Sequence, residues 1–225
     1  MSNRLYSWTL TMSEDGKQFY PGKSPSFAGN VYRDLLLSNF IASGSNVMVR
    51  RAAVESVGPF DSTVNGVEDW DYCLRLAQKW PFALVPKAQI LYRQMEESTS
   101  SKVRKMEKVH FVVHDKFFRD SSSDLKALEP QSRSVCYRYL TKLAIAHAHT
   151  WRDVAFALKR LLLSIWVYPK GLLNKEVYLL ILKMFLITVL TPAFGKKALD
   201  FLRKIKVSRT LEDVPVPKKL AMDLE

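Results

Sequence analysis

The sequence predicts an α/β protein followed by an all-α C-terminal region. Short apolar or alternating runs at 46–50, 82–86 and 88–93 lie between segments with helical spacing, a pattern typical of a sheet with covering helices. Beyond the polar run RDSSSD, three long helical patterns follow with no strand signal. We therefore predict two regions: 1–120, which holds the sheet, and 121–225, a helical basic tail.

Turn residues and apolar spacing define the elements of the first region. The first thirty residues are rich in turn signals and are expected to be irregular with short strands. The run RAAVESVGPFD predicts a short helix, which Gly58 followed by Pro59 ends. Two short strands are expected on either side of Pro86. Further helices are expected at 30–41, 67–79 and 100–118.

Composition excludes several classes of protein. The 225 residues include only 8 glycines, and no Walker A, G-x-G-x-x-G or G-x-S-x-G sequence is present. The two cysteines, Cys73 and Cys136, form no C-x-x-C pair, so a zinc site or disulfide scaffold is not expected and a reducing cytosol is the simpler setting. The N-terminus has no continuous apolar run, so a secretory signal is not expected.

The formal charge of +12 is concentrated in the tail. Residues 151–219 hold 14 Lys/Arg against 5 Asp/Glu, interleaved with long aliphatic side chains. The run VYLLILKMFLITVL is too short for a membrane span. We expect the tail to lie on an anionic membrane, at its cytoplasmic inner face; the alternative is a soluble helical hairpin with a solvated lysine face. Only the charge favours nucleic-acid binding, so no specific nucleic acid is expected.

Three carboxylates open the helix predicted at 67–79. Acidic side chains in a first turn interact well with the helix dipole, and Asn65 with Glu68 matches a capping box. Capping does not require all three acids. Asp69 and Asp71 have the letters of a D-x-D metal motif, but residues two apart on a helix do not face each other. The stretch therefore suits one positioned carboxylate rather than a chelating pair.

The histidines do not predict a metal site. His110 and His114 have the i, i+4 spacing of zinc ligands. However, Phe111 stands where H-E-x-x-H needs its glutamate, and no third ligand is evident.

The middle of the chain resembles a known family. The run SGSNVMVRRAAVESVGPFDSTVNGVEDWDYCLRLAQKWPFALVPKAQILYRQ resembles the acceptor-side, C-terminal part of family 2 glycosyltransferases, and the likeness spans about 41–118. It implies a partial GT-A (Rossmann-like) fold. It also implies that Asp69 is the catalytic base, and that Glu68 orients Asp69 or binds the acceptor, with capping as the equal alternative for Glu68. Residues expected near the donor or acceptor are Ser43, Ser45, Asn46, Arg50, Trp70 and Arg93.

Two departures from the family pattern limit this resemblance. The family binds Mg²⁺ or Mn²⁺ through a D-x-D at a strand end, and no such motif precedes residue 41. Met95 stands where the family often has a histidine, and a thioether is a poor ligand for a hard cation. A divalent cation is thus expected from the family, but its ligands are not visible. The expected alternatives are a truncated product, one half of a split enzyme with a separate nucleotide-binding half, or a degenerate remnant.

The resemblance implies inverting transfer of a sugar from a nucleotide-sugar to a hydroxyl acceptor, in surface polysaccharide or glycolipid synthesis. The alternative is an inactive remnant that acts as a membrane-associated binding or scaffold protein.

Overall fold

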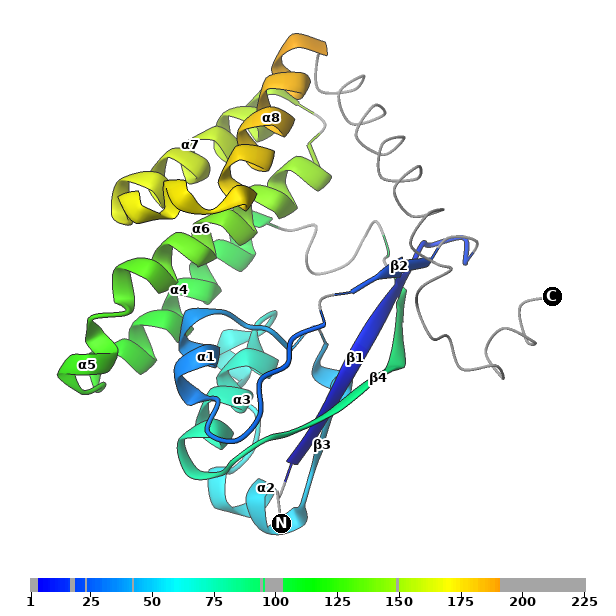
Figure 1. The fold of residues 1–225 in the computed structure, drawn as a ribbon, viewed down its shortest axis with the longest axis vertical. Helices are drawn as coiled ribbons and strands as arrows, with labels where there is room; N and C mark the ends of the chain where they lie inside the picture. The colour runs from blue at the N-terminus through cyan, green and yellow to red at the C-terminus, as the bar shows by residue number, and fades with distance from the viewer. Residues whose placement is uncertain are drawn as a thin grey trace.

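The structure, a computed structural model, describes residues 4–16, 19–22, 24–41, 43–93, 95, 103–148 and 150–190. Four strands form one mixed sheet: β1 (Arg4–Met12), β2 (Phe19–Pro21), β3 (Val47–Val49) and β4 (Ala83–Arg93). The helices are α1 (Tyr32–Leu37), α2 (Arg51–Val57), α3 (Glu68–Lys79), α4 (Val103–Arg119), α5 (Ser123–Lys126), α6 (Glu129–Ala146), α7 (Trp151–Val167) and α8 (Lys175–Leu190). Figure 1 shows the sheet beside α1 and α3, with α6, α7 and α8 stacked at the other end of the molecule.

Strand β1 is the centre of the sheet. It pairs with β4 in parallel along most of its length, and antiparallel with β3 near its start and β2 near its end. The sequence predicted an irregular segment with short strands; strands are present, but β1 is nine residues long rather than short. Polar and apolar residues alternate along β1, and Tyr6 and Leu10 are buried on one face while Ser7 and Thr9 are buried on the other. The alternation from Tyr6 to Met12 is itself a strand pattern, so β1 could have been predicted from the sequence.

Strand β4 is continuous, so the expectation of two strands around Pro86 is wrong. Ser7 is paired with Val85 and Trp8 with Ala88, so the register shifts by an irregularity in this interval. Pro86 falls inside the shift, where a residue without an amide hydrogen breaks no ladder hydrogen bond. The bulge lets a single strand carry the proline.

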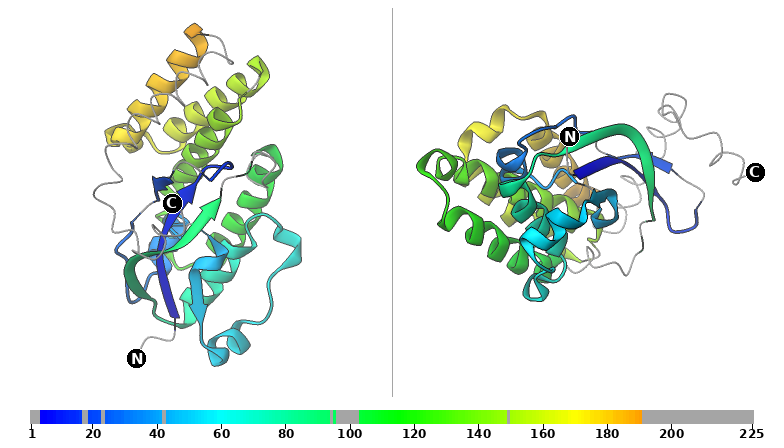
Figure 2. Two further views of the ribbon diagram at one scale, coloured as in Figure 1. Left: turned by 90° about the vertical axis from the view of Figure 1, so that its right-hand side faces the viewer. Right: turned by 90° about the horizontal axis from the view of Figure 1, so that it is seen from below.

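The sheet, α1, α3 and α4 share the first hydrophobic cluster, which includes Tyr6, Leu35 and Trp70. Figure 2 shows these helices grouped to one side of the strands. The start of α6 joins the same cluster through Cys136, and the Ser132 hydroxyl donates to the Leu36 carbonyl at 2.5 Å. Packing thus continues across residue 120, while the division at that residue stays a prediction.

Helices α6, α7 and α8 form a second cluster around Leu140, Leu161 and Leu180. Thr150 and Asp153 form a capping box that starts α7. Arg160 of α7 binds both carboxylate oxygens of Glu107 in α4, at 2.6 and 2.8 Å, and so joins the two clusters. The predicted α/β fold with an all-helical C-terminal region is confirmed. No helix in the described part of the chain is long and apolar enough to cross a membrane.

Candidate active site

The start of α3 is built by a turn rather than by a polar cap. Helix α3 begins at Glu68, and Val67, which precedes it, offers no capping side chain. The expected capping box from Asn65 is therefore wrong. The chain turns at Gly66, whose φ of 107° favours glycine, and the Glu68 carboxylate accepts a hydrogen bond from the Gly66 amide. Glu68 is thus engaged with the turn before the helix.

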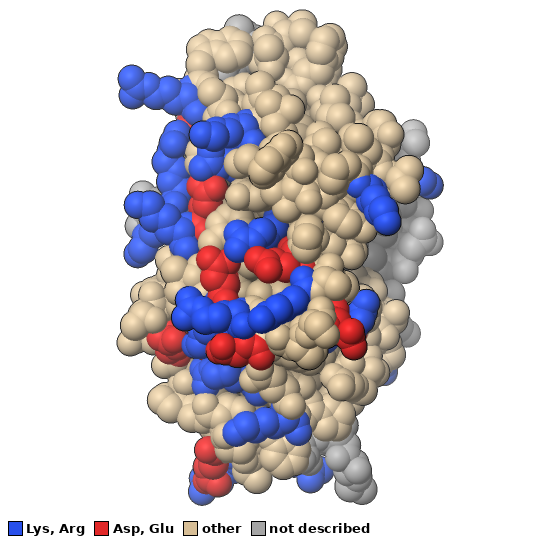
Figure 3. Space-filling model, turned by 90° about the vertical axis from the view of Figure 1, so that its left-hand side faces the viewer, with Lys and Arg blue, Asp and Glu red and all other residues tan. Residues whose placement is uncertain are grey.

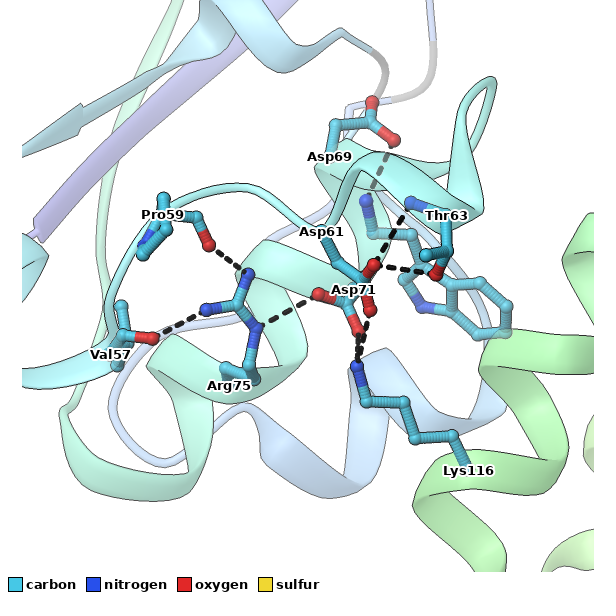
Figure 4. A network of polar contacts seen from close by, with 9 residues as sticks. Val57, Pro59, Asp61, Thr63, Asp69, Asp71, Arg75 and Lys116 are labelled. Carbon is cyan, nitrogen blue, oxygen red and sulfur yellow. Dashed lines mark hydrogen bonds and ion pairs between the residues drawn. The ribbon is translucent and has the colours of Figure 1, made fainter.

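Asp71 lies on the side of α3 that faces α2 and α4. Its carboxylate accepts from Arg75 Nε at 2.8 Å and from Lys116 Nζ at 2.7 Å, and its side chain is fully buried. The two Nη atoms of Arg75 donate to the carbonyls of Val57, the last residue of α2, and of Pro59, two residues later. Figure 4 shows this network on one side of the helix and Asp69 turned away from it. Asp69 and Asp71 thus point to different sides of α3 (Figure 4), as expected for residues two apart on a helix.

Asp69 lies on the other side and lines a cavity of about 870 Å³. One of its oxygens accepts from the Trp70 amide at 2.7 Å, and no cation of the described residues forms an ion pair with it. Burial raises the pKa of Asp69 to about 6, and the charge of Glu68 adds to the rise. A carboxylate in this state is ionised at neutral pH and is a stronger base than an exposed aspartate.

The loop before β3 closes over Asp69. A Cβ atom added at Gly44 would lie 3.3 Å from the Asp69 Cβ and 3.8 Å from its Oδ2. Ser43, beside it, lines the cavity and accepts a hydrogen bond from the Ser45 amide at 3.2 Å. The loop can therefore approach the carboxylate closely only because residue 44 has no side chain.

An aromatic stack continues from Trp70 along the cavity. Trp70 is 1% exposed, its indole donates to the Leu35 carbonyl, and its ring stacks on His110 with centroids 4.5 Å apart. His110 in turn lies 5.7 Å from the Tyr139 ring. Burial lowers the pKa of His110 to about 4, and burial together with the Asp69 charge raises the pKa of Tyr139 to about 12. The wall beside Asp69 is therefore neutral at physiological pH.

The other predicted binding residues lie apart from the described cavity lining. The Asn46 side chain exchanges hydrogen bonds with Ser7, at 2.5 to 3.0 Å, and ties the loop to β1. Ser45 and Arg50 are exposed, and Arg93 donates to the Glu14 carbonyl. Asp69, Ser43 and Trp70 meet at the cavity, and the binding roles of all these residues stay predictions.

Most of the described fold, including the start of α3 with Asp69, lies within a match to a known family. Residues 3–140 match the family described as "Glycosyltransferase like family 2". The chain belongs to this family. The match extends beyond the expected 41–118 at both ends, so it takes in β1 and most of α6.

One relative supports this assignment. An "uncharacterized glycosyltransferase YwdF" of Bacillus subtilis (strain 168) is 36% identical to this family 2 chain over 85 residues. The aligned part is 37% of this chain and 31% of that protein. No solved structure matches the chain significantly.

Another part of the cavity lining comes from the tail, where the sequence indicated no site residue. Arg138, Tyr139 and Lys142 of α6 and Glu176 of α8 line the same cavity as Asp69. Arg138 and Lys142 are spaced i, i+4, so their spacing places them on one face of a helix. The sequence does not predict that this face of α6 contacts Glu176, nor that it lines the same cavity as Asp69.

The divalent cation expected from the family finds no matching ligand set among the described residues. Asp69 and Glu176 are the carboxylates of the cavity lining, and Glu176 is already paired with Arg138 at 3.0 Å and with Lys142. A second group of ligand atoms, His114, Asp115 and Glu129, lies outside that lining. Arg133 already occupies it, at 2.6 Å from Asp115 and 3.0 Å from Glu129. We therefore assign no step to a metal.

Proposed function

We propose that the chain takes part in inverting glycosyl transfer and that Asp69 is the general base. The observation that carries this proposal is a carboxylate with a raised pKa, unpaired among the described residues, at the wall of a cavity large enough for a sugar. Paired Asp71, two residues away, offers no such group.

In the proposed reaction the acceptor hydroxyl oxygen attacks the anomeric carbon of a nucleotide-sugar. A new C–O bond forms as the bond to the diphosphate breaks, and the nucleoside diphosphate leaves with the bonding electrons. Asp69 takes the hydroxyl proton, for which it must lie within hydrogen-bond reach of the acceptor. The Trp70 amide, bound to one oxygen, holds the carboxylate in place.

The test is transfer measured from several sugar nucleotides, with and without the product of the neighbouring gene. Asp69→Asn should lower the transfer rate by about 10²- to 10⁴-fold, because an amide cannot take the proton. An unchanged rate in this variant would show that Asp69 is not the base. Calorimetry that gives no heat with UDP- or GDP-sugars in any of these preparations would favour the alternative of an inactive binding protein.

The pH dependence of transfer gives a second test. Since the pKa of Asp69 is about 6, kcat/KM should rise about tenfold per pH unit below pH 6 and level off above it. A profile that is flat between pH 5 and pH 7, measured with the same acceptor, would contradict the assignment of the base.

We also propose that the tail docks on an anionic membrane at its cytoplasmic face. Large apolar side chains are exposed along α7, the 3-10 turn Pro169–Leu173 and α8, including Trp166 at 77% and Phe185 at 62% exposure. Figure 3 shows a broad area without charged side chains in the upper part of the molecule, bordered by lysines and arginines. Exposed cations on the same elements are Arg152, Lys159, Lys170, Lys175 and Lys183. An apolar face with a cationic border suits an anionic lipid surface.

Flotation with vesicles tests the membrane proposal. The chain should float with vesicles that contain phosphatidylglycerol and less with pure phosphatidylcholine. Replacing Trp166 and Phe185 together by serine should abolish flotation, whereas Val112→Ser should not, because Val112 is also well exposed but lies on α4. Equal flotation of both variants would exclude this face. The cationic residues between 191 and 219 lie outside the described residues.

A further inference from the structure

The part of the Asp69 cavity lined by α6 and α8 carries two cations around one carboxylate. Arg138 Nε lies 3.0 Å from one oxygen of Glu176, and Lys142 pairs with the other. Burial alone would raise the pKa of Glu176, but the hydrogen bonds and charges of Lys142 and Arg138 lower it, so Glu176 stays ionised. The group keeps one positive charge in excess.

Arg138 is held in place before any ligand arrives. The residue is buried, and its Nη1 donates to the Ser134 hydroxyl at 2.8 Å. The Ser134 hydroxyl in turn donates to the Ser164 carbonyl of α7. Gly171 packs on the same guanidinium, since a Cβ there would lie 3.5 Å from Nη1. Nη2 donates to no described residue, so this one nitrogen of the guanidinium remains for a ligand oxygen.

We infer that Arg138 and Lys142 form an anion subsite that binds a phosphate group of the substrate in the same cavity as Asp69. Arg138 can donate one charge-assisted hydrogen bond to a phosphate oxygen from Nη2, and Lys142 adds a mobile point charge. Lys142, which is 36% exposed, can move from Glu176 to a ligand. The inference deepens the proposed function, on which it rests, by giving the substrate a charged group.

The matches to known proteins assign no role to this subsite. Lys142 and Glu176 lie beyond residue 140, where the family match ends. A phosphate here has two sources: the diphosphate of the sugar donor, or a phosphate carried by the acceptor. The two share one chemistry and are separated by the ligands chosen for the test.

Calorimetry of the full chain with glucose 1-phosphate and glucose tests the subsite. The sugar phosphate should bind, the sugar alone should bind at least about tenfold more weakly, and added salt should reduce the difference. Lys142→Gln should lower the affinity for glucose 1-phosphate by about tenfold. The matched control is Lys108→Gln, a lysine of α4 outside the cavity lining, which should change nothing.

A second variant gives an effect of the opposite sign. Glu176→Gln removes the charge that competes for both cations, so glucose 1-phosphate should bind several-fold more tightly. If the three side chains only clamp α6 to α8, this variant should destabilise the fold with no gain in affinity. That result, or equal affinities for glucose and glucose 1-phosphate, would overturn the inference.

Nucleotides identify the source of the phosphate. If UDP or GDP displaces glucose 1-phosphate, the subsite takes the donor diphosphate; if both bind together, it takes an acceptor phosphate. Binding is read without turnover, so the outcome is independent of the catalytic assignment. Binding of glucose 1-phosphate that is weakened by Lys142→Gln in a preparation without transfer activity would leave the subsite standing while the proposed function fails, so the two failures are distinguishable.

Discussion

The two sides of helix α3 treat the same chemical group in opposite ways. On one side Asp71 is fully buried, and two cations from α3 and α4 hold it. On the other side Asp69 has a backbone amide as its hydrogen-bond donor and a pKa of about 6. Asp71 and Asp69 are two residues apart and point to opposite sides of α3; the first holds helices together, and the second can take a proton.

Removing the charge of Asp71 should give the largest loss of stability. Asp71→Asn leaves Arg75 and Lys116 without their shared anion, and we expect the free energy of unfolding to fall by about 3 kcal/mol. Urea denaturation followed by circular dichroism measures this. The matched variant is Asp61→Asn, which removes the more exposed partner of Lys116 and should have a smaller effect. Equal losses would contradict the contrast between the two carboxylates.

Removing the charge of Asp69 should instead stabilise the fold. The folded-state pKa of about 6 lies above the unfolded value, so between pH 4 and 6 the folded state binds more protons and stability falls as pH rises. Asp69→Asn should lack this slope and gain roughly 2 kcal/mol at pH 8, with no gain near pH 4. Unfolding at both pH values measures it. A loss of stability at pH 8 would show that Asp69 is engaged in an ion pair.

A methyl group at position 44 should give the smallest effect. Gly44→Ala places a Cβ 3.3 Å from the Asp69 Cβ, so either the loop or the carboxylate must shift by a few tenths of an ångström. We expect kcat to fall about tenfold, as misplacing a base does, with little change in the midpoint of thermal unfolding. Unchanged kcat would mean that the loop yields and the carboxylate stays in place.

Local rules predict much of this fold. Apolar spacing locates α3, α4 and the three tail helices, and the step of about 200° between Asp69 and Asp71 is enough to point the two carboxylates in different directions. Strand β1 also follows these rules, because polar and apolar residues alternate from Tyr6 to Met12. Strand β4 does not, because a bulge accommodates Pro86 within a single strand.

The part of the cavity lined by α6 and α8 depends on long-range packing, which the spacing of residues in the sequence does not specify. Arg138 forms an ion pair with Glu176, which is 38 residues away in the sequence. Both residues line the Asp69 cavity only because α6 packs on α1. The raised pKa of Asp69 has the same origin, since burial depends on what covers the residue.

Helix α6 belongs to both hydrophobic clusters: Cys136 packs in the first, and Leu140, one turn later, in the second. Because one helix contributes to both clusters, the packing of each cluster fixes the position of α6 in the other. The cavity around Asp69 therefore forms late: during stepwise synthesis its lining is not complete until α6 and α8 have both been made. We therefore expect the two clusters to unfold in one cooperative transition rather than in two.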